Sequence, residues 1–289
     1  MITTQSQGSD VAIPAEDGLV LRGRYWRRPD PRGVIVVAHG FGEHGGCYRH
    51  VAHALTDSLN VDFLAPDLRG HGRSPGRRGV VARYEELVSD VRSAVDWVAR
   101  ERRNLPRFLL GHSNGGLLAL RVVLEGSHEL SGLITSNPSL KLATRVPAYK
   151  LAIGRFLLRH APGVTLSAKL PAEMMTRDPE MQQEHRTDPL RHSRISAPLF
   201  FGMVGSGAQV ANQAETIELP TLMLAGAADH VTDPEGSRRF FERLGATDKT
   251  LRVYPEMRHE PLNEIGREQV FADLTRWLED HLEAAMSAS

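Results

Sequence analysis

The sequence contains a single cysteine, and this scarcity excludes several kinds of protein. With Cys47 alone, no disulfide can form within the chain, and a zinc site built from several cysteines is impossible. The sequence also lacks any run of about 18 apolar residues, so we expect no membrane span. Neither sign of charge is in excess, because 35 Lys and Arg residues balance 35 Asp and Glu residues. A chain without net charge gives no electrostatic reason to expect nucleic acid as a partner.

The first ten residues are polar and lack the apolar core of a signal peptide. We therefore expect a cytoplasmic protein. The length of 289 residues fits one large α/β domain and leaves room for an insertion.

Short apolar or alternating segments, separated by segments with helical spacing, follow one another along most of the chain. This alternation predicts an α/β fold with a mostly parallel sheet and helices on both faces. The predicted strands are 11–14, 19–26, 33–38, 61–65, 107–110, 130–135, 221–225 and 250–254. The predicted helices are 48–58, 84–102, 115–124, 234–244 and 268–285.

One long segment interrupts the alternation, because no buried strand is evident between residues 137 and 218. We predict that residues 138–218 form a helical cap inserted between two parts of the core, 1–137 and 219–289. A surface decoration without a role is the alternative. In the predicted helix 148–160, Ile153, Phe156 and Leu157 share one face, and Arg155 and Arg159 lie opposite. This apolar face either packs on the main domain or lines an entrance that touches lipid aggregates.

The pattern G-x-S-x-G occurs twice, at Ser113 and at Ser74, and the mechanism of serine hydrolases separates the two copies. A nucleophilic serine lies on a sharp turn between a strand and a helix, and the next residue donates its N–H to the oxyanion. Ser113 follows the predicted strand 107–110 and precedes an apolar helix. Ser74 is followed by Pro75, which has no N–H to donate. Ser113 is therefore the predicted nucleophile, and Ser74 is predicted to be a turn residue.

The oxyanion of the tetrahedral intermediate needs two preorganised N–H donors. The backbone of Asn114 is one candidate, and the second is expected from the loop after an early strand. That loop begins at His39, and the N–H of Phe41 is the candidate donor. His39 precedes the nucleophile in the chain, so we expect it to hold the loop by hydrogen bonding and not to act as a base.

The acid and the base should follow the nucleophile in the order Ser, Asp, His. Asp229 lies just after the predicted strand 221–225. Its rival, Asp233, precedes a proline at a helix start and has the pattern of an N-cap. His259 lies on a loop between the last strand and the last helix, whereas His230 adjoins Asp229 and His281 is expected on a solvated helix face. His259 is the predicted base, oriented by Asp229.

Six segments together resemble the monoacylglycerol lipase and lysophospholipase family of α/β-hydrolases, from about Asp10 onward. The resemblance implies an eight-stranded sheet, a helical cap and cleavage of esters of long or medium acyl chains. It places the triad on Ser113, Asp229 and His259, and the oxyanion donors on Phe41 and Asn114. The segments are HGFGEHGGCY (39–48), DLRGHGRS (67–74), LLGHSNGG (109–116), DPL (188–190), GAADHV (226–231) and RHE (258–260).

Two positions depart from the pattern of family members that bind glycerol. These members commonly have Arg where this chain has Cys47, and they can have His where it has Leu262. Glu43 is retained. The resemblance therefore implies ester hydrolysis and leaves a preference for monoglyceride open. Asn114 replaces the usual Met, a mild change because its backbone does the work.

Other functions are weaker alternatives. A general carboxylesterase for short or bulky esters is the nearest, followed by a lysophospholipase or an amidase, and then by a non-catalytic binding protein on the same scaffold. A metal hydrolase is disfavoured because His39 and His44 lack the helical H-E-x-x-H spacing, and residues 202–207 lack the ending of a phosphate loop. We expect a small ester or lipid substrate, and no metal or cofactor.

Overall fold

The computed structural model describes residues 8–126, 129–168 and 170–287, and its centre is a sheet of eight strands in the order β1-β2-β4-β3-β5-β6-β9-β10. β2 runs antiparallel to both β1 and β4, and every other neighbouring pair is parallel. The predicted fold class is confirmed. The strands are β1 (Ser9–Pro14), β2 (Val20–Trp26), β3 (Val34–Ala38), β4 (Asp62–Asp67), β5 (Arg107–His112), β6 (Gly132–Ser136), β9 (Thr221–Gly226) and β10 (Lys249–Tyr254).

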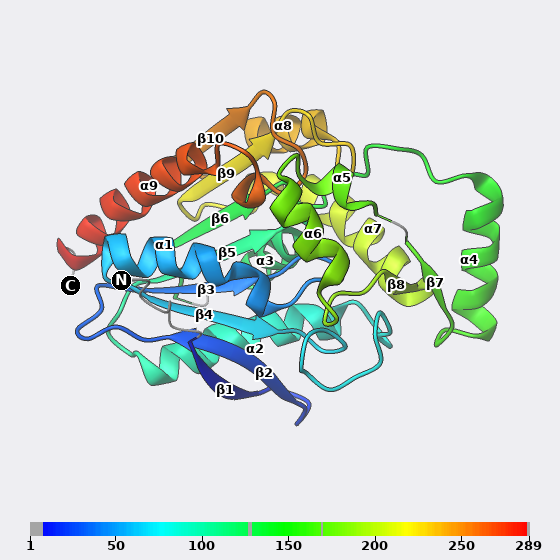
Figure 1. The fold of residues 1–289 in the computed structure, drawn as a ribbon, viewed down its shortest axis with the longest axis horizontal. Coiled ribbons are helices and arrows are strands. Elements are labelled where there is room, and N and C mark those ends of the chain that lie inside the picture. Colours follow the sequence, from blue (N-terminus) through cyan, green and yellow to red (C-terminus); the bar gives the residue numbers. More distant parts are fainter. Residues whose placement is uncertain (1–7, 127–128, 169, 288–289) are drawn as a thin grey trace.

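Helices cover both faces of this sheet, as Figure 1 shows. The central strands β3 and β5 are buried at every position, which explains their nearly continuous apolar sequences. One face packs against α1 (Arg49–Leu59) and α9 (Arg267–Ser287). The other packs against α2 (Glu85–Glu101), α3 (Asn114–Leu124) and α8 (Pro234–Arg243). Two separate apolar cores therefore hold the sheet rigid between its helical layers.

A third group of elements lies between β6 and β9 in the chain, beyond one end of the sheet, with α4 farthest out (Figure 1). Among the described residues of this group no strand belongs to the central sheet, but two three-residue strands pair with each other, which the sequence pattern did not predict. The division into a separate cap domain stays a prediction. These elements are α4 (Ala148–His160), β7 (Thr165–Ser167), α5 (Ala172–Met175), α6 (Pro179–Thr187), β8 (Arg194–Ser196), α7 (Ala197–Asn212) and η2 (Ala214–Thr216).

Two short 3-10 turns connect core elements near the site. A 3-10 turn, η1 (Gly45–Tyr48), precedes α1, so the predicted helix begins one residue later than expected. A second, η3 (Pro261–Asn263), follows the predicted base. Among the helices of the described residues, none is long and apolar enough to cross a membrane.

Candidate active site

Ser113 lies at the turn between β5 and α3, with backbone angles φ 54° and ψ −119°. A non-glycine residue rarely adopts a positive φ, so the turn is strained and is maintained by its surroundings. The flanking glycines allow this close packing. A Cβ on Gly111 would lie 2.4 Å from the carbonyl oxygen of Gly115, and a Cβ on Gly115 would lie 2.0 Å from that of Ala38. The G-x-S-x-G pattern is thus explained by backbone contacts on both sides of the serine.

The structure brings the three predicted catalytic side chains together. His259 Nε2 is 2.8 Å from Ser113 Oγ, and His259 Nδ1 is 2.8 Å from Asp229 Oδ2. All three residues are buried. They come from the ends of β5, β9 and β10, which meet at one edge of the sheet, as expected for parallel strands.

Electrostatics in this chain of hydrogen bonds favour a charged Asp229 and a basic His259. Burial alone would raise the pKa of the Asp229 carboxyl, but His259 and Thr232 lower it below its ordinary value. Burial alone would lower the pKa of His259, but the Asp229 carboxylate raises it above 6.5. A carboxylate can only accept, so Nδ1 carries the imidazole proton and Nε2 is free to accept the proton of Ser113.

Asn137 holds the histidine loop in place, and sequence reasoning did not identify this role. Its Nδ2 donates to the carbonyl oxygens of Arg258 and His259, at 3.1 and 2.8 Å, and its Oδ1 accepts from the N–H of Gly226 at 3.0 Å. It follows β6 with a φ of 42°, a left-handed conformation that asparagine tolerates better than most residues. No local pattern marked it, because all its partners are distant in the sequence.

The structural roles that the sequence predicted for three rival residues are confirmed. Ser74 lies in a turn, where its Oγ accepts from the N–H of Arg22 and donates to a backbone carbonyl. Asp233 caps α8 by accepting from the N–H of Glu235. His39 hydrogen-bonds within its own loop and accepts from the backbone N–H of residue 68.

Two other histidines contribute no side chain to the triad. The side chain of His230 is exposed, although it adjoins Asp229. The expectation of a solvated position for His281 is wrong, because its ring stacks on Trp277 at 3.8 Å and its side chain is largely covered. This stacking fixes the last helix and brings no histidine to the site.

The two predicted oxyanion donors lie on the loop after β3 and at the first residue of α3, and side-chain hydrogen bonds hold both positions. Among the described residues, the backbone N–H groups of Phe41 and Asn114 have no hydrogen-bond acceptor. The Glu43 carboxylate accepts from the N–H of Gly40 and from the hydroxyl of Tyr48, both at 2.8 Å, and so fixes the loop of Phe41. The Asn114 side chain accepts from the hydroxyl of a buried tyrosine at 2.7 Å, which leaves its backbone as the group available to substrate.

Two cavities lie near the nucleophile, and their walls share no residue. A polar one of about 300 Å³ contains Ser113 and His259 in its wall, and an apolar one of about 720 Å³ contains Ser139. Ser139 Oγ is 3.2 Å from Ser113 Oγ, so the serine lies between the two spaces. Other residues of the polar cavity are Glu43, His112, His185, Arg191 and Glu260. Other residues of the apolar cavity are Leu140, Leu151, Phe200, Phe201, Met203 and Phe240.

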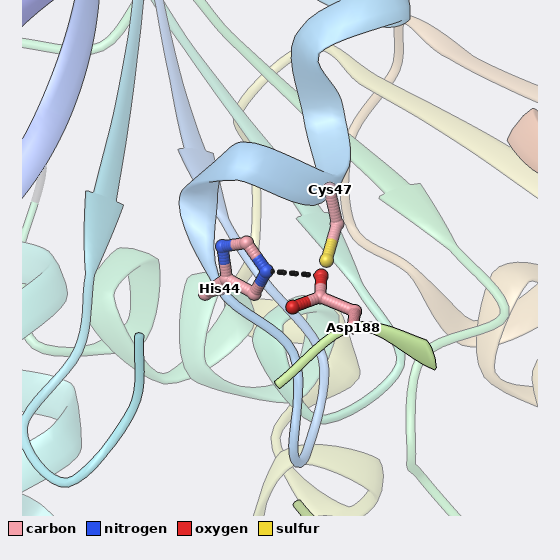
Figure 2. A group of neighbouring side chains, drawn as sticks. All are labelled: His44, Cys47 and Asp188. Atoms are coloured by element: carbon pink, nitrogen blue, oxygen red, sulfur yellow. Dashed lines mark hydrogen bonds and ion pairs between the residues drawn. The ribbon is translucent and has the colours of Figure 1, made fainter. Parts of the chain in front are cut away.

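A cluster of three residues next to the oxyanion loop has side-chain types that can bind a metal. Figure 2 shows His44 bonded to Asp188, at 2.7 Å, with the sulfur of Cys47 pointing at the same carboxylate. The N–H of Gly46 donates to His44 Nδ1, so Nε2 carries the proton and is already used by Asp188. Burial raises the pKa of the Cys47 thiol to about 12, and the neighbouring Arg191 adds positive charge. We interpret this cluster as a link between cap and core.

Comparison with known proteins places this geometry among hydrolases. Residues 29–266 match the family model described as serine aminopeptidase S33. The monoacylglycerol lipase of Mycolicibacterium smegmatis is 34% identical over 88% of this chain and 90% of that protein. The monoglyceride lipase of Mus musculus is 32% identical over 93% and 90%.

Two solved structures are similar to the whole fold. That of the Paleococcus ferrophilus monoacylglycerol lipase has a TM-score of 0.82 and 33% identity, covering 90% of this chain and 99% of that one. That of a soluble variant of the Saccharomyces cerevisiae monoglyceride lipase has a TM-score of 0.87 and 24% identity, covering 97% and 98%. The second, at this identity, is evidence for the fold alone.

Proposed function

The chain belongs to the monoacylglycerol lipase-like family of α/β-hydrolases and matches the family model of serine aminopeptidase S33. We propose that it cleaves carboxylic esters of acyl chains through an acyl-enzyme on Ser113. The observation that carries this proposal is the continuous hydrogen-bonded chain from Ser113 through His259 to Asp229. Its position between an apolar and a polar cavity suits an ester with one apolar and one polar half.

Each chemical step has a residue in a suitable position. His259 Nε2 takes the proton of Ser113 as Oγ attacks the ester carbonyl, and Asp229 stabilises the imidazolium that forms. The N–H groups of Phe41 and Asn114 stabilise the oxyanion of the tetrahedral intermediate. His259 then gives its proton to the leaving alcohol. Water hydrolyses the acyl-enzyme by the same sequence, with His259 again as the base.

Each cavity suits one half of the substrate. The apolar cavity, at about 720 Å³, lies within the size range of ligand pockets and is lined mostly by apolar side chains, so it takes the acyl chain. The polar cavity takes the alcohol. The substrate class is therefore a single-chain lipid ester of monoacylglycerol or lysophospholipid type. A general carboxylesterase for short esters is the alternative.

The outer surface of the cap supports contact with lipid aggregates. Phe156 and Ile153 on α4 are 61% and 48% exposed, so the interpretation that this apolar face packs on the main domain is wrong. The helix instead contacts α7 through its other side, where a Cβ on Gly154 would meet Phe201 at 3.1 Å. Other exposed apolar residues of the cap are Tyr149, Leu158, Val164, Leu166 and Val204. An apolar face beside arginines suits a lipid interface.

Labelling and a substrate panel test the reaction. A fluorophosphonate should attach to Ser113 in the wild type and should not label Ser113→Ala. Rates on p-nitrophenyl esters of increasing length should rise towards long chains. A maximum at the shortest esters would favour the general carboxylesterase.

A separate variant tests the lipid contact. Phe156→Asp should lower activity on long-chain monoacylglycerol vesicles more than on a short p-nitrophenyl ester, with the melting temperature little changed. Gln183→Asp introduces the same single negative charge at an exposed polar position of α6 and is the matched control. Equal loss on both substrates would contradict a role at the interface.

A further inference from the structure

Arg191 reaches the polar cavity from the cap, where it lies in the loop between α6 and β8. Its side chain is only 13% exposed. The guanidinium is 3.4 Å from Glu43 Oε1 and 3.7 Å from Glu260 Oε1. These distances exceed the 2.7–2.9 Å of a charged N–H···O hydrogen bond. Toward the described residues, the guanidinium is thus held by charge and retains N–H groups that can donate to a ligand.

The cavity around Arg191 has no excess of positive charge. Burial works against the guanidinium, but Cys47 and the two carboxyl groups raise the pKa of Arg191 above its ordinary value. Burial would raise the pKa of Glu43, yet Arg191 helps to lower it. Formally, one positive group therefore faces two carboxylates.

The remaining titratable groups of the cavity add no free positive charge, and the Asp188 carboxylate is hydrogen-bonded to His44. Burial lowers the pKa of His112, His185 and His192, which favours their neutral forms. Arg186 is paired with Glu173. An anionic phosphate would consequently meet more negative than positive charge at the alcohol end of the site.

A polyol suits this set of groups better than any ion. Each hydroxyl can accept from the guanidinium and donate to a carboxylate at the same time. The same two carboxylates and His112 have ligand atoms within 4.8 Å of one another, a grouping that could hold a cation. The positive guanidinium of Arg191 lies beside this grouping and would repel a cation. Cys47, next to Arg191, is small, and Leu262 is apolar, so neither side chain offers a strong hydrogen-bond donor. Arg191 supplies such a donor from the cap.

We propose that Arg191 determines specificity by binding the hydroxyl groups of a neutral polyol in the alcohol half of the substrate. This inference rests on the proposed ester hydrolysis. It assigns the discrimination between a glycerol ester and a phosphate-bearing or simple alkyl ester to one cap residue. It also makes recognition of the alcohol depend on the position of the cap.

The test compares wild type, Arg191→Lys and Arg191→Met on three esters of the same acyl chain: a monoacylglycerol, a methyl ester and an anionic lysophospholipid, lysophosphatidic acid. Lysine keeps the charge and loses the planar fork. We expect kcat/KM on the monoacylglycerol to fall about 10- to 100-fold in both variants, as for loss of hydrogen bonds to a charged group, chiefly through KM. The rate on the methyl ester should change less than about threefold, and wild type should prefer the monoacylglycerol to the lysophospholipid. Arg194→Met removes the same charge from an exposed position of the same cap segment and is the control.

The outcomes separate this inference from the proposed function. A wild type inactive on all three esters would refute the proposed function. A wild type that cleaves the methyl ester but prefers the lysophospholipid, or shows no preference, would overturn the role of Arg191 alone. Equal losses on all esters, with a lower melting temperature, would show that Arg191 only holds the cap. If Arg191→Met does not fold, Arg191→Lys still decides the question.

Discussion

Replacing Asp229 by asparagine should disable the base without disturbing the fold. The carboxylate oxygen Oδ1 accepts from two backbone N–H groups, those of Val231 at 2.7 Å and Thr232 at 3.2 Å. The amide oxygen of an asparagine must take this position, because an NH₂ group there would face two donors. The NH₂ group is then forced towards His259 Nδ1, where Oδ2 now accepts at 2.8 Å.

The reversed hydrogen bond selects the wrong tautomer of His259. Nδ1 must accept from the new NH₂ group, so the proton moves to Nε2, which then cannot accept the proton of Ser113. Loss of a triad aspartate in this way costs about 10⁴-fold in turnover, which corresponds to about 5.4 kcal/mol of transition-state stabilisation. Loss of the carboxylate also removes the group that raises the pKa of His259.

The assay is kcat on a p-nitrophenyl ester, with the melting temperature measured in parallel. Asp233→Asn is the matched control, since Asp233 is an N-cap four residues away and asparagine also caps well. It should cost at most about 1 kcal/mol of stability and leave turnover intact. Asp229→Asn with turnover within tenfold of wild type, or an inactive Asp233→Asn that is still folded, would refute the assignment of the acid.

Three further expectations can be checked with the same assay. Ser113→Ala should lose ester hydrolysis almost completely, whereas Ser74→Ala should stay active and lose about 1 kcal/mol of stability with its turn hydrogen bonds. Equal activity of the two variants would contradict the assignment of Ser113 as the nucleophile. The value of kcat/KM should fall as the pH drops through the pKa of His259, which is raised above 6.5, because protonation removes its neutral, basic form. A flat profile from pH 5 to 8 would exclude a histidine base. Gly115→Ala should give little folded enzyme, since its Cβ would lie 2.0 Å from a backbone oxygen; normal yield and activity would show that the turn can relax.

The sequence predicted the core well because the core depends on local patterns. The runs of β3 and β5 are buried on both faces, and burial on both faces leaves a continuous apolar signal. The choice of Ser113 over Ser74 was possible for the same reason. A proline after one serine, and a strand and a helix around the other, are visible within ten residues.

The cap was less predictable because its contacts are short and irregular. β7 and β8 have three residues each and no fully buried apolar alternation, so no periodic signal marks them. The apolar face of α4 was recognised, but whether it packs or stays exposed depends on the direction in which the helix leaves the core. That direction depends on contacts with distant residues, such as the bridge between Leu142 and Thr232 and the Ala143 N–H that donates to the carbonyl oxygen of Val231 at 3.0 Å, just before α4.

The polar end of the site is built from contacts that leave no local sign in the sequence. In the sequence, Cys47 and Leu262 depart from the pattern of family members that bind glycerol and leave a preference for monoglyceride open. The folded chain brings Arg191 to that end from a loop nearly 150 residues away from Glu43, its partner. The cap approaches this closely because Gly42 has a φ of +74° and no side chain, whereas a Cβ there would lie 2.0 Å from the carbonyl oxygen of His192. Gly42 therefore belongs to the loop of Phe41, and its lack of a side chain also lets the loop of Arg191 pack against that loop.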